Sequence, residues 1–378
     1  MIYHLVSNFR WTERSEPAAD LVLGQCESGA EARLVCGRNR AREEDSVAYQ
    51  ARRKGLDPTV LEFPKHFRWR AAYHDIRALR GLLAQTGGQH VFHSHLPNAQ
   101  LMAVLTTSRC HPRALVVHSH YDPDGASIPL RTRVYAAAGT RGWVVISPRA
   151  AATLVNRYGV PSEQVAVIEP PVDVERFQAP QITSGAARAR FGLSPDDVVV
   201  GLVTRIGTNR GILPMLQALQ RIGPQCPGLR CLVIGRGDIA GAITKPAAEL
   251  GISERIVLGG YCRDDQLVAA YRAMDVYGYM QPGTDKSCRA IREAMSAGVA
   301  VVGRRMGYIP DLVREGETGL LFADTDGLAS ALQSLYADRQ KCIHMGQAAA
   351  ADAAARFDRK QQGQKVLAFY QRLLAARA

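Results

Sequence analysis

The feature that most constrains the fold of this sequence is an alternation of short apolar runs with helical patterns, which occurs twice along its 378 residues. In the first half, runs such as Ile2–Val6 and Leu115–His120 predict strands, and segments such as Ala71–Leu83 predict helices. The pattern restarts at Val198–Thr204 and continues to Leu320–Phe322. Strands alternating with helices are typical of right-handed βαβ units, so we predict an α/β fold of two doubly wound parallel sheets.

The length of the chain and its linker-like segments indicate where two domains meet. A chain of 378 residues is longer than the chains that usually fold around a single hydrophobic core. Glu169–Pro171 and the polar stretch Gln178–Ala187 separate the two runs of alternating elements. We therefore expect a Rossmann-like N-terminal domain at 1–178 and a Rossmann-like C-terminal domain at 179–358. Two such domains imply a cleft between the carboxyl ends of their sheets, where ligands bind in these folds.

Charge and cysteine content narrow the classes of function. Lys and Arg number 47 against 35 Asp and Glu, a formal net charge of +12, which favours an anionic partner. Anionic lipid and phosphorylated small substrates fit this charge. No basic-aromatic module of a known nucleic-acid-binding type is present, so we expect no nucleic acid. The eight cysteines form no C-x-x-C pair, which argues against a zinc ribbon or a disulfide scaffold.

The sequence shows no pattern for export or for membrane insertion. Its start, MIYHLVSNFRWTE, is too short and too polar for a signal peptide. No run approaches the roughly 20 apolar residues that a membrane span needs. We therefore expect a cytoplasmic protein with reduced thiols.

One stretch, Gln281–Val302, combines a loop, a helix and a buried strand. A Pro-Gly-Thr turn at 282–284 precedes good helix formers, the helix ends at Gly298, and the apolar run Val299–Val302 follows. The start of such a helix presents unpaired backbone N–H groups and a positive dipole end, which suit an anion. Asp285 stands in the loop, and Glu293 stands eight positions later in the helix. Our hypothesis is that a nucleotide-sugar diphosphate binds there, with the two carboxylates holding hydroxyls.

A second loop brings cations to the end of a predicted strand. Thr204–Gly211 follows a buried strand, precedes a helix and carries Arg205 and Arg210. The planar fork of an Arg side chain suits phosphate oxygens, and a solvated turn is the alternative for this loop. Gly235–Gly237 follows the next strand, and we interpret this lone G-x-G as a tight strand-to-helix turn.

Four histidines form two H-x-H pairs, His93/His95 and His118/His120, each at the end of a predicted strand. Residues i and i+2 of a strand share a face, so each pair could chelate a metal. No third ligand has matching spacing, and we predict no metal site. We expect one member of each pair to face the cleft, with His93 and His118 as buried, hydrogen-bonded histidines.

The segment Phe63–Arg70 mixes basic and aromatic residues, and the basic character continues to Arg77 and Arg80. Such a surface suits an anionic acceptor or anionic lipid, so peripheral contact with the inner face of the cytoplasmic membrane is one interpretation. The other is an ordinary solvated helix whose arginines lay their apolar stems along the protein surface.

With these motifs placed, the chain resembles the retaining glycosyltransferases of family 4, which have the GT-B fold of two Rossmann-like domains facing a cleft. The resemblance covers most of the chain. In the amino half, His93–Pro97 resembles the family's H-A-H-L, and Val117–His120 resembles its T-x-H strand end. The motifs of the second half are Val167–Phe177, the Thr204–Gly211 loop, the Asp285-x7-Glu293 pair, and Gly307–Val313 followed by Gly316–Leu321.

The resemblance implies catalytic roles for two residues. Asp285 would hold hydroxyls of the donor sugar, and His120 would lie at the sugar, near the reacting centre. The implied reaction is a front-face displacement with retention, in which the leaving phosphate helps to take the acceptor proton. Such chemistry depends on positioning and on stabilising charge on the departing diphosphate. It needs neither a metal nor a cofactor, and a UDP- or GDP-sugar would serve as co-substrate.

The resemblance also implies how the donor is held. The two arginines of the Thr204–Gly211 loop would bind the diphosphate, and Glu293 would hold the ribose. Backbone from Lys286 to Arg289 would contact phosphate. The donor-binding candidates are Arg205, Arg210, Ser287, Cys288, Arg289 and Glu293. The terminal helix at 359–378 would cross back onto the N-terminal domain, as it does in the family.

The chain departs from the family's pattern at three places. The first motif carboxylate is Asp285 in place of Glu. Lys286-Ser287-Cys288 replaces a G-F-G, which brings Arg289 beside the phosphate region. The first loop, Ser7–Trp11, lacks the usual glycine pair and is bulky and basic. Since this loop faces the acceptor in the family, an acidic acceptor such as a phosphorylated lipid-linked saccharide or a lipopolysaccharide core would suit it.

These inferences predict a retaining glycosyltransferase that moves a sugar from a nucleotide sugar to a saccharide or lipid-linked acceptor. The pathway we expect is the synthesis of lipopolysaccharide, exopolysaccharide or another envelope glycan. A sugar-nucleotide epimerase with the same fold is one alternative, although the Arg205 loop and the Asp285/Glu293 pair fit it less well. A non-catalytic binding subunit is the other alternative, and the altered Lys286–Cys288 loop is its main argument.

Overall fold

The computed structural model describes residues 1–39, 42–85, 87–107, 114–125, 134, 138–179, 182–281 and 286–376. It divides into an N-terminal unit, Met1–Val172 with Phe357–Ala378, and a C-terminal unit, Asp173–Arg356. The chain passes from the first unit to the second between Val172 and Asp173, a few residues before the boundary that we expected between residues 178 and 179. The reason is that helix α7 (Val174–Gln178) packs within the C-terminal unit, where Arg272 donates to the carbonyls of Phe177 and Gln178 at 3.0 and 2.9 Å.

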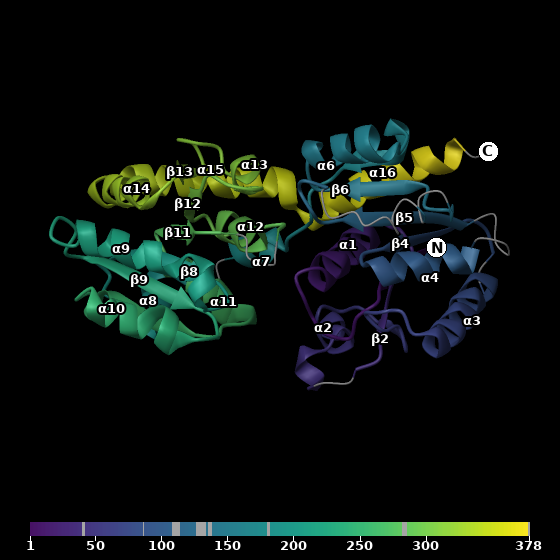
Figure 1. The fold of residues 1–378 in the computed structure, drawn as a ribbon, viewed down its shortest axis with the longest axis horizontal. Coiled ribbons are helices and arrows are strands. Elements are labelled where there is room, and N and C mark those ends of the chain that lie inside the picture. Colours follow the sequence, from purple (N-terminus) through teal and green to yellow (C-terminus); the bar gives the residue numbers. More distant parts are fainter. Residues whose placement is uncertain are drawn as a thin grey trace. The chain divides into compact units, whose positions relative to one another are not determined.

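The N-terminal unit is built on a seven-stranded sheet in the order β3-β2-β1-β4-β5-β6-β7. Figure 1 labels β2, β4, β5 and β6 of this sheet. All neighbouring strands are parallel. The strands are β1 (Ile2–Val6), β2 (Ala32–Gly37), β3 (Thr59–Leu61), β4 (His90–Ser94), β5 (Ala114–His120), β6 (Gly142–Val145) and β7 (Val165–Val167).

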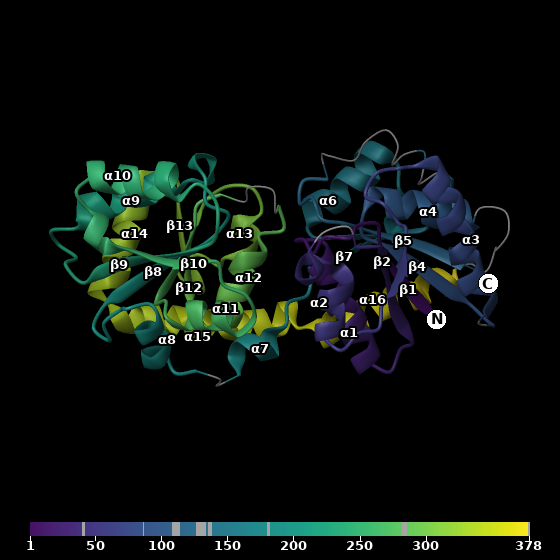
Figure 2. The ribbon, with the colours of Figure 1, turned by 90° about the horizontal axis from the view of Figure 1, so that it is seen from below.

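Helices cover both faces of this sheet. Figure 2 shows α1 and α16 side by side on one face, and α3 and α4 on the other. Because both faces are covered, β1 and β4 are buried along their whole length. The helices are α1 (Ser15–Glu27), α2 (Val47–Arg53), α3 (Trp69–Gln85), α4 (Pro97–Thr107), α6 (Pro148–Ala152) and α16 (Arg359–Ala375).

Helix α16 is an integral part of the N-terminal unit. It approaches α1 closely at two glycines: a Cβ on Gly24 would lie 1.9 Å from the carbonyl oxygen of Arg359, and one on Gly363 would lie 2.6 Å from the backbone of Gly24. Its apolar side chains, among them Val366 and Phe369, enter the core against β4, β5 and β6. The C-terminal segment therefore completes one layer of the unit in which the chain begins.

The C-terminal unit contains a six-stranded parallel sheet in the order β10-β9-β8-β11-β12-β13. Figure 2 shows α9 and α10 on one face of this sheet and α8, α11 and α15 on the other. Its strands are β8 (Val198–Val203), β9 (Leu229–Ile234), β10 (Ile256–Gly260), β11 (Val276–Tyr279), β12 (Ala300–Arg304) and β13 (Gly319–Phe322). Its other helices are α8 (Ser184–Arg190), α9 (Ile212–Ile222), α10 (Lys245–Glu249), α11 (Asp264–Arg272), α12 (Arg289–Ser296), α13 (Ile309–Leu312), α14 (Thr325–Ala337) and α15 (Arg339–Phe357).

The prediction of two doubly wound parallel sheets is confirmed. In each sheet the strand order reverses once, between β1 and β4 in the first and between β8 and β11 in the second. Within the described part of the chain, no helix has the length and apolar character to cross a bilayer.

Candidate functional site

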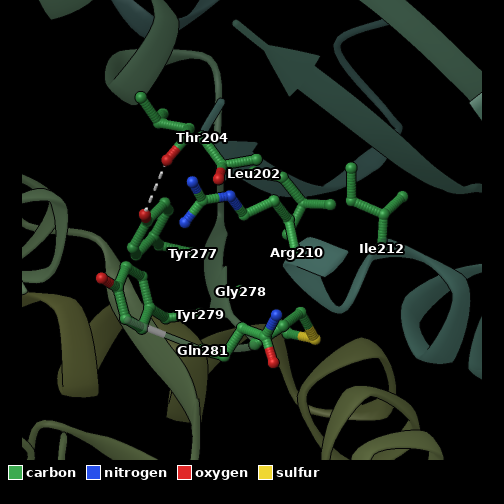
Figure 3. A pocket seen from close by; sticks show the side chains of 10 residues that line it. Leu202, Thr204, Arg210, Ile212, Tyr277, Gly278, Tyr279 and Gln281 are labelled. Atoms are coloured by element: carbon green, nitrogen blue, oxygen red, sulfur yellow. Dashed lines mark hydrogen bonds between the residues drawn. The ribbon is translucent and has the colours of Figure 1, made fainter. Parts of the chain in front are cut away.

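A pocket in the C-terminal unit lies where the strand order reverses. Its walls come from the carboxyl ends of β8 and β11 and from the segments that follow them (Figure 3). The lining includes Thr204, Arg210, Tyr277, Tyr279 and Gln281. In open α/β sheets, ligands bind outside the carboxyl ends of the strands at this reversal. The pocket therefore has the position expected of a ligand site.

The loop after β8 carries the two predicted cations, and the structure gives them different surroundings. Arg210 lines the pocket, and Figure 3 shows its guanidinium reaching toward Thr204 and Tyr277. Arg205 is exposed to solvent. Gly211 follows with φ +72°, and a Cβ at this position would lie 2.6 Å from the Cβ of Met280. A glycine is thus required where this loop turns into α9.

The G-x-G segment after β9 packs directly against that loop. A Cβ on Gly235 would lie 1.9 Å from the carbonyl oxygen of Thr204, and one on Gly237 would lie 1.9 Å from that of Ile206. The backbone N–H of Ile206 donates to the carbonyl of Arg236 at 3.0 Å. The glycines therefore serve the tight turn that the sequence predicted, and they also let the two loops touch.

The segment before α12 contains both described and undescribed candidates. Asp285 lies outside the described residues. Ser287 is buried, and its carbonyl and hydroxyl oxygens accept from the two Nη atoms of Arg292 at 2.6 and 3.3 Å. Cys288 is fully buried with φ +53° and ψ 45°, a left-handed conformation, at the first boundary of α12. The start of α12 is therefore held from inside the unit by Arg292.

Glu293 is fixed through both of its carboxylate oxygens. Oε1 accepts from Nε of Arg289 at 2.6 Å, and Oε2 accepts from the Tyr271 hydroxyl at 3.0 Å. Both members of the Arg289–Glu293 ion pair are largely buried. Burial raises the pKa of Tyr271 well above its ordinary value, and the Glu293 charge adds to this effect. The structure thus brings Arg289 and Glu293 together and adds a tyrosine from α11.

Two residues of this site, Arg292 and Tyr271, were missed by sequence reasoning. A fully buried arginine next to Glu293 could have been suspected, because Arg292 stands on the face of α12 that also carries apolar residues such as Met295. No sequence pattern pointed to Tyr271, because it lies in α11 and a strand and a loop separate that helix from α12.

The predicted catalytic histidine, His120, is the last residue of β5 and is partly buried. It belongs to the N-terminal unit, whereas the other described candidates belong to the C-terminal unit. Its ring centroid lies 6.5 Å from that of His118. His118 is buried, with Nδ1 2.9 Å from the Ser94 hydroxyl, and burial holds its pKa well below the ordinary value.

In the other histidine pair, His93 is buried as expected, and the expectation that one member of the pair is open to a cleft is wrong. Both are buried, at 0% and 1% exposure, because α1 and α16 cover the face of the sheet that carries them. His4 of β1 joins them, and one nitrogen from each of the three rings lies within 4.8 Å of the others. No pattern in the sequence pointed to this third histidine, which lies 91 positions from its partner His95.

Two family models match the chain. "Glycosyltransferase Family 4" matches residues 18–176, and "Glycosyl transferases group 1" matches residues 184–352. Together they span most of both structural units.

Curated relatives agree with these models. A D-inositol 3-phosphate glycosyltransferase of Nocardia farcinica is 33% identical over 210 residues, which are 53% of this chain and 46% of that protein. One from Stackebrandtia nassauensis is 30% identical over 327 residues, 79% of this chain and 72% of that protein. A GDP-mannose-dependent alpha-(1-6)-phosphatidylinositol monomannoside mannosyltransferase of Mycolicibacterium smegmatis is 27% identical, over 63% of this chain and 65% of that protein. The match thus spans less than half of the first of these relatives.

Solved structures share the fold. Anabaena Alr3699/HepE in complex with UDP and glucose superposes with a TM-score of 0.78 at 17% identity, over 98% of this chain and 99% of that one. At this identity the likeness concerns the fold.

Proposed function

The chain belongs to the group 1 glycosyl transferases of family 4 and has their GT-B fold. From this premise we propose that it transfers a sugar, with retention of configuration, from a UDP- or GDP-sugar to an anionic saccharide or lipid-linked acceptor. The observation that carries the proposal is the pocket at the strand reversal of the C-terminal unit, with Arg210 in its wall.

In this proposal the donor diphosphate is bound by cations and by backbone. Arg210 and Arg205 bind its oxygens, since a guanidinium can make two parallel hydrogen bonds to phosphate. Backbone N–H groups from Ser287 to Arg289, at the start of α12, bind further oxygens with the favourable end of the helix dipole.

Glu293 holds the ribose in this proposal. Each carboxylate oxygen has two lone pairs, so Glu293 can accept ribose hydroxyls beside its bonds from Arg289 and Tyr271. Those bonds fix the carboxylate before the donor arrives, which reduces the entropy cost of binding.

Asp285 and His120 act at the sugar. Asp285 holds sugar hydroxyls, and His120 lies beside the reacting centre. The acceptor hydroxyl attacks the anomeric carbon on the face that the diphosphate leaves, and a departing phosphate oxygen takes its proton. Arg205, Arg210 and the start of α12 stabilise the charge on the leaving group, the role that a divalent ion fills in other enzymes. We therefore expect EDTA to leave the rate unchanged.

Thermal-shift screening with UDP-, GDP- and ADP-sugars, followed by transfer assays with labelled donors, tests this assignment. We expect one donor class to stabilise the protein. Arg210→Ala and Glu293→Gln should each lower kcat/KM about 100-fold. Arg190→Ala, at an exposed position of α8 in the same unit, should retain the wild-type value.

Three results would count against the assignment. Full activity in both Arg210→Ala and Glu293→Gln would exclude the proposed donor site. The absence of a thermal shift with every donor would favour a non-catalytic binding subunit. Interconversion of the donor sugar without an acceptor would favour an epimerase.

For the acceptor we propose a phosphorylated molecule of envelope glycan synthesis, such as a lipid-linked saccharide or a lipopolysaccharide core. In the first loop, Asn8 Oδ1 accepts from the backbone N–H groups of Phe9 and Arg10 at 2.9 and 3.2 Å, which orders a loop with an exposed arginine. The names of the relatives give acceptors that bear phosphate, D-inositol 3-phosphate and a phosphatidylinositol mannoside. Activity on neutral acceptors alone, in a panel of neutral and phosphorylated saccharides, would contradict this proposal.

We also propose that the chain works in the cytoplasm and touches the inner face of an anionic membrane through α3 and the segment before it. Phe67, Trp69 and Tyr73 are 55%, 69% and 65% exposed. Arg70 lies over the Trp69 ring at 4.9 Å, and Lys65, Arg68 and Arg77 are exposed around it. A merely solvated helix does not account for three large exposed aromatic side chains, whereas aromatic rings among cations are typical of a membrane interface.

Flotation with neutral and anionic liposomes tests the membrane contact. We expect binding that depends on anionic lipid and that is lost in the double variant Trp69→Ser/Tyr73→Ser. Leu213→Ser, which removes a 45% exposed side chain from the C-terminal unit, is the matched control. Equal flotation of the double variant and the control would refute the contact.

A further inference from the structure

A continuous series of hydrogen bonds runs through the interior of the N-terminal unit; we call it the histidine circuit. Its members are Tyr121, His95, His4, Gln25, Tyr370, His93 and Ser119. The successive distances are 2.7, 2.9, 2.9, 3.5, 2.5 and 2.7 Å. All of them except the partly buried Tyr121 are buried. The circuit joins β1, β4 and the end of β5 to α1 and α16.

The amide oxygen of Gln25 determines the direction of the bonds on one side. An amide oxygen only accepts, so Nε2 of His4 carries the proton that it shares with Gln25. Burial lowers the pKa of His4 to about 4, so the ring is neutral and its Nδ1 is an acceptor. Nε2–H of His95 donates to that Nδ1, and Nδ1 of His95 then accepts from the Tyr121 hydroxyl.

The amide nitrogen of Gln25 determines the direction on the other side. It donates to the Tyr370 oxygen, so the Tyr370 proton goes to Nδ1 of His93. Burial holds the pKa of His93 well below its ordinary value, so this ring is also neutral, carries its proton on Nε2 and donates to Ser119. From Tyr121 to Ser119, each member of the circuit therefore donates its hydrogen bond to the next member. The three histidines share one tautomer, with the proton on Nε2.

The two ends of the histidine circuit are the residues on either side of His120. The backbone that carries His120 is thus held at both neighbours by His93 of β4 and by His95, which follows that strand. Tyr370 of α16 bonds to His93, and Gln25 of α1 reaches His95 through His4. We propose that the histidine circuit orients His120 for the transfer reaction, with Tyr370 and His93 as positioning residues. This inference rests on the role proposed above for His120. It makes α16 part of the site, through a contact between residues 277 positions apart.

A metal site is the other use that three adjacent histidines suggest. Each ring nitrogen of His4, His93 and His95 already has a hydrogen-bond partner in the circuit. A metal held by one nitrogen of each ring would break at least two of these bonds and leave a buried partner of His93, such as the Tyr370 hydroxyl, unsatisfied, which is costly. The geometry therefore favours the hydrogen-bonded arrangement.

Nuclear magnetic resonance of the full chain with ¹⁵N-labelled histidine tests the circuit directly. Two-dimensional correlation of ring nitrogens with ring protons should show His4, His93 and His95 as neutral Nε2–H tautomers from pH 8 to pH 6, before and after addition of Zn²⁺. An Nδ1–H tautomer at any of the three, or a change of their signals with Zn²⁺, would overturn the assigned direction.

The positioning role is tested with Tyr370→Phe, which removes one hydroxyl from the middle of the circuit. Tyr3→Phe is the matched control, because Tyr3 is a buried tyrosine of the same unit whose hydroxyl bonds to the Leu82 carbonyl at 3.2 Å outside the circuit. Tyr370→Phe should shift the ring signals of His120 and lower kcat about tenfold or more with the donor KM unchanged. Tyr3→Phe should leave both as in wild type.

Tyr121→Phe provides a second variant at the margin of the core, and it should move the His120 signals as Tyr370→Phe does. Wild-type His120 signals in both variants would end the positioning proposal and leave the transferase proposal intact. Absence of transfer in the wild-type protein would end the transferase proposal, while the His120 signals would still decide whether the circuit orients that ring.

Discussion

At the residue scale, the departure of the chain from its family's pattern centres on Cys288. Its left-handed conformation costs a residue with a side chain about 1–2 kcal/mol relative to glycine. The G-F-G that Lys286-Ser287-Cys288 replaces would place glycine there. The chain thus keeps the backbone conformation that glycine favours and fills the adjacent space with a buried thiol.

This account predicts opposite outcomes for two substitutions of Cys288. Cys288→Gly should retain donor binding, because glycine adopts φ +53° without strain. Cys288→Val should lower donor affinity about tenfold or more, since a β-branched residue strongly disfavours positive φ and would displace the start of α12. Titration calorimetry with the nucleoside diphosphate measures both. Equal affinities for the two variants would show that this conformation does not matter for binding.

At the element scale, the site depends on direct backbone contact between the loops after β8 and β9. Gly235 and Gly237 leave no room for a Cβ against Thr204 and Ile206. The loop that carries Arg205 and Arg210 is therefore supported by its neighbour on both sides of Arg205, at Thr204 and at Ile206. This support is present before any ligand binds, which is the form of preorganisation that favours tight binding.

Gly237→Ala should therefore push the arginine loop outward and weaken donor binding about tenfold or more, since its Cβ would lie 1.9 Å from the Ile206 oxygen. Gly192→Ala is the matched control, because Gly192 also has a positive φ, +67°, with no atom within 4 Å of an added Cβ. The control should lose about 1 kcal/mol of stability and keep its donor affinity. Titration calorimetry measures the donor affinity and urea unfolding measures the stability, so the two effects can be told apart. Unchanged affinity in Gly237→Ala would contradict the supporting role.

At the scale of the whole molecule, the first and last parts of the chain form one structural unit around neutral histidines. Burial lowers the pKa of His4 to about 4 and holds those of His93, His95 and His118 well below the ordinary value. The unfolded chain therefore binds more protons than the folded chain below about pH 6.5. The stability that these neutral rings contribute is fully present above that pH and is lost as the pH falls toward 4.

We predict that the free energy of unfolding falls steeply between pH 6.5 and pH 4, with about 3 kcal/mol from His4 alone. Urea unfolding at a series of pH values measures this slope. His4→Gln should make the slope shallower, whereas His74→Gln, at an exposed position of α3, should leave it unchanged. A His4→Gln slope equal to that of wild type would contradict the prediction.

Much of the fold could be predicted because its signals are local. Apolar runs and helical periods lie within single elements, so the two parallel sheets followed from their alternation along the chain. The positions of Arg210 after β8 and of Glu293 in α12 followed in the same way, since each lies in or beside a predicted element. Whether the whole donor set acts as proposed remains a prediction.

By itself, then, the sequence determined the fold class and the loops that bear the candidate site. Only the tertiary structure decided which side chains meet. It paired Glu293 with Tyr271, buried His95 against His4, and joined His93 to Tyr370 across 277 positions. The physical reason is that strand and helix patterns are set by neighbours along the chain, whereas these hydrogen bonds exist only after α1, α11 and α16 have packed against their sheets and excluded water from the polar groups beneath them.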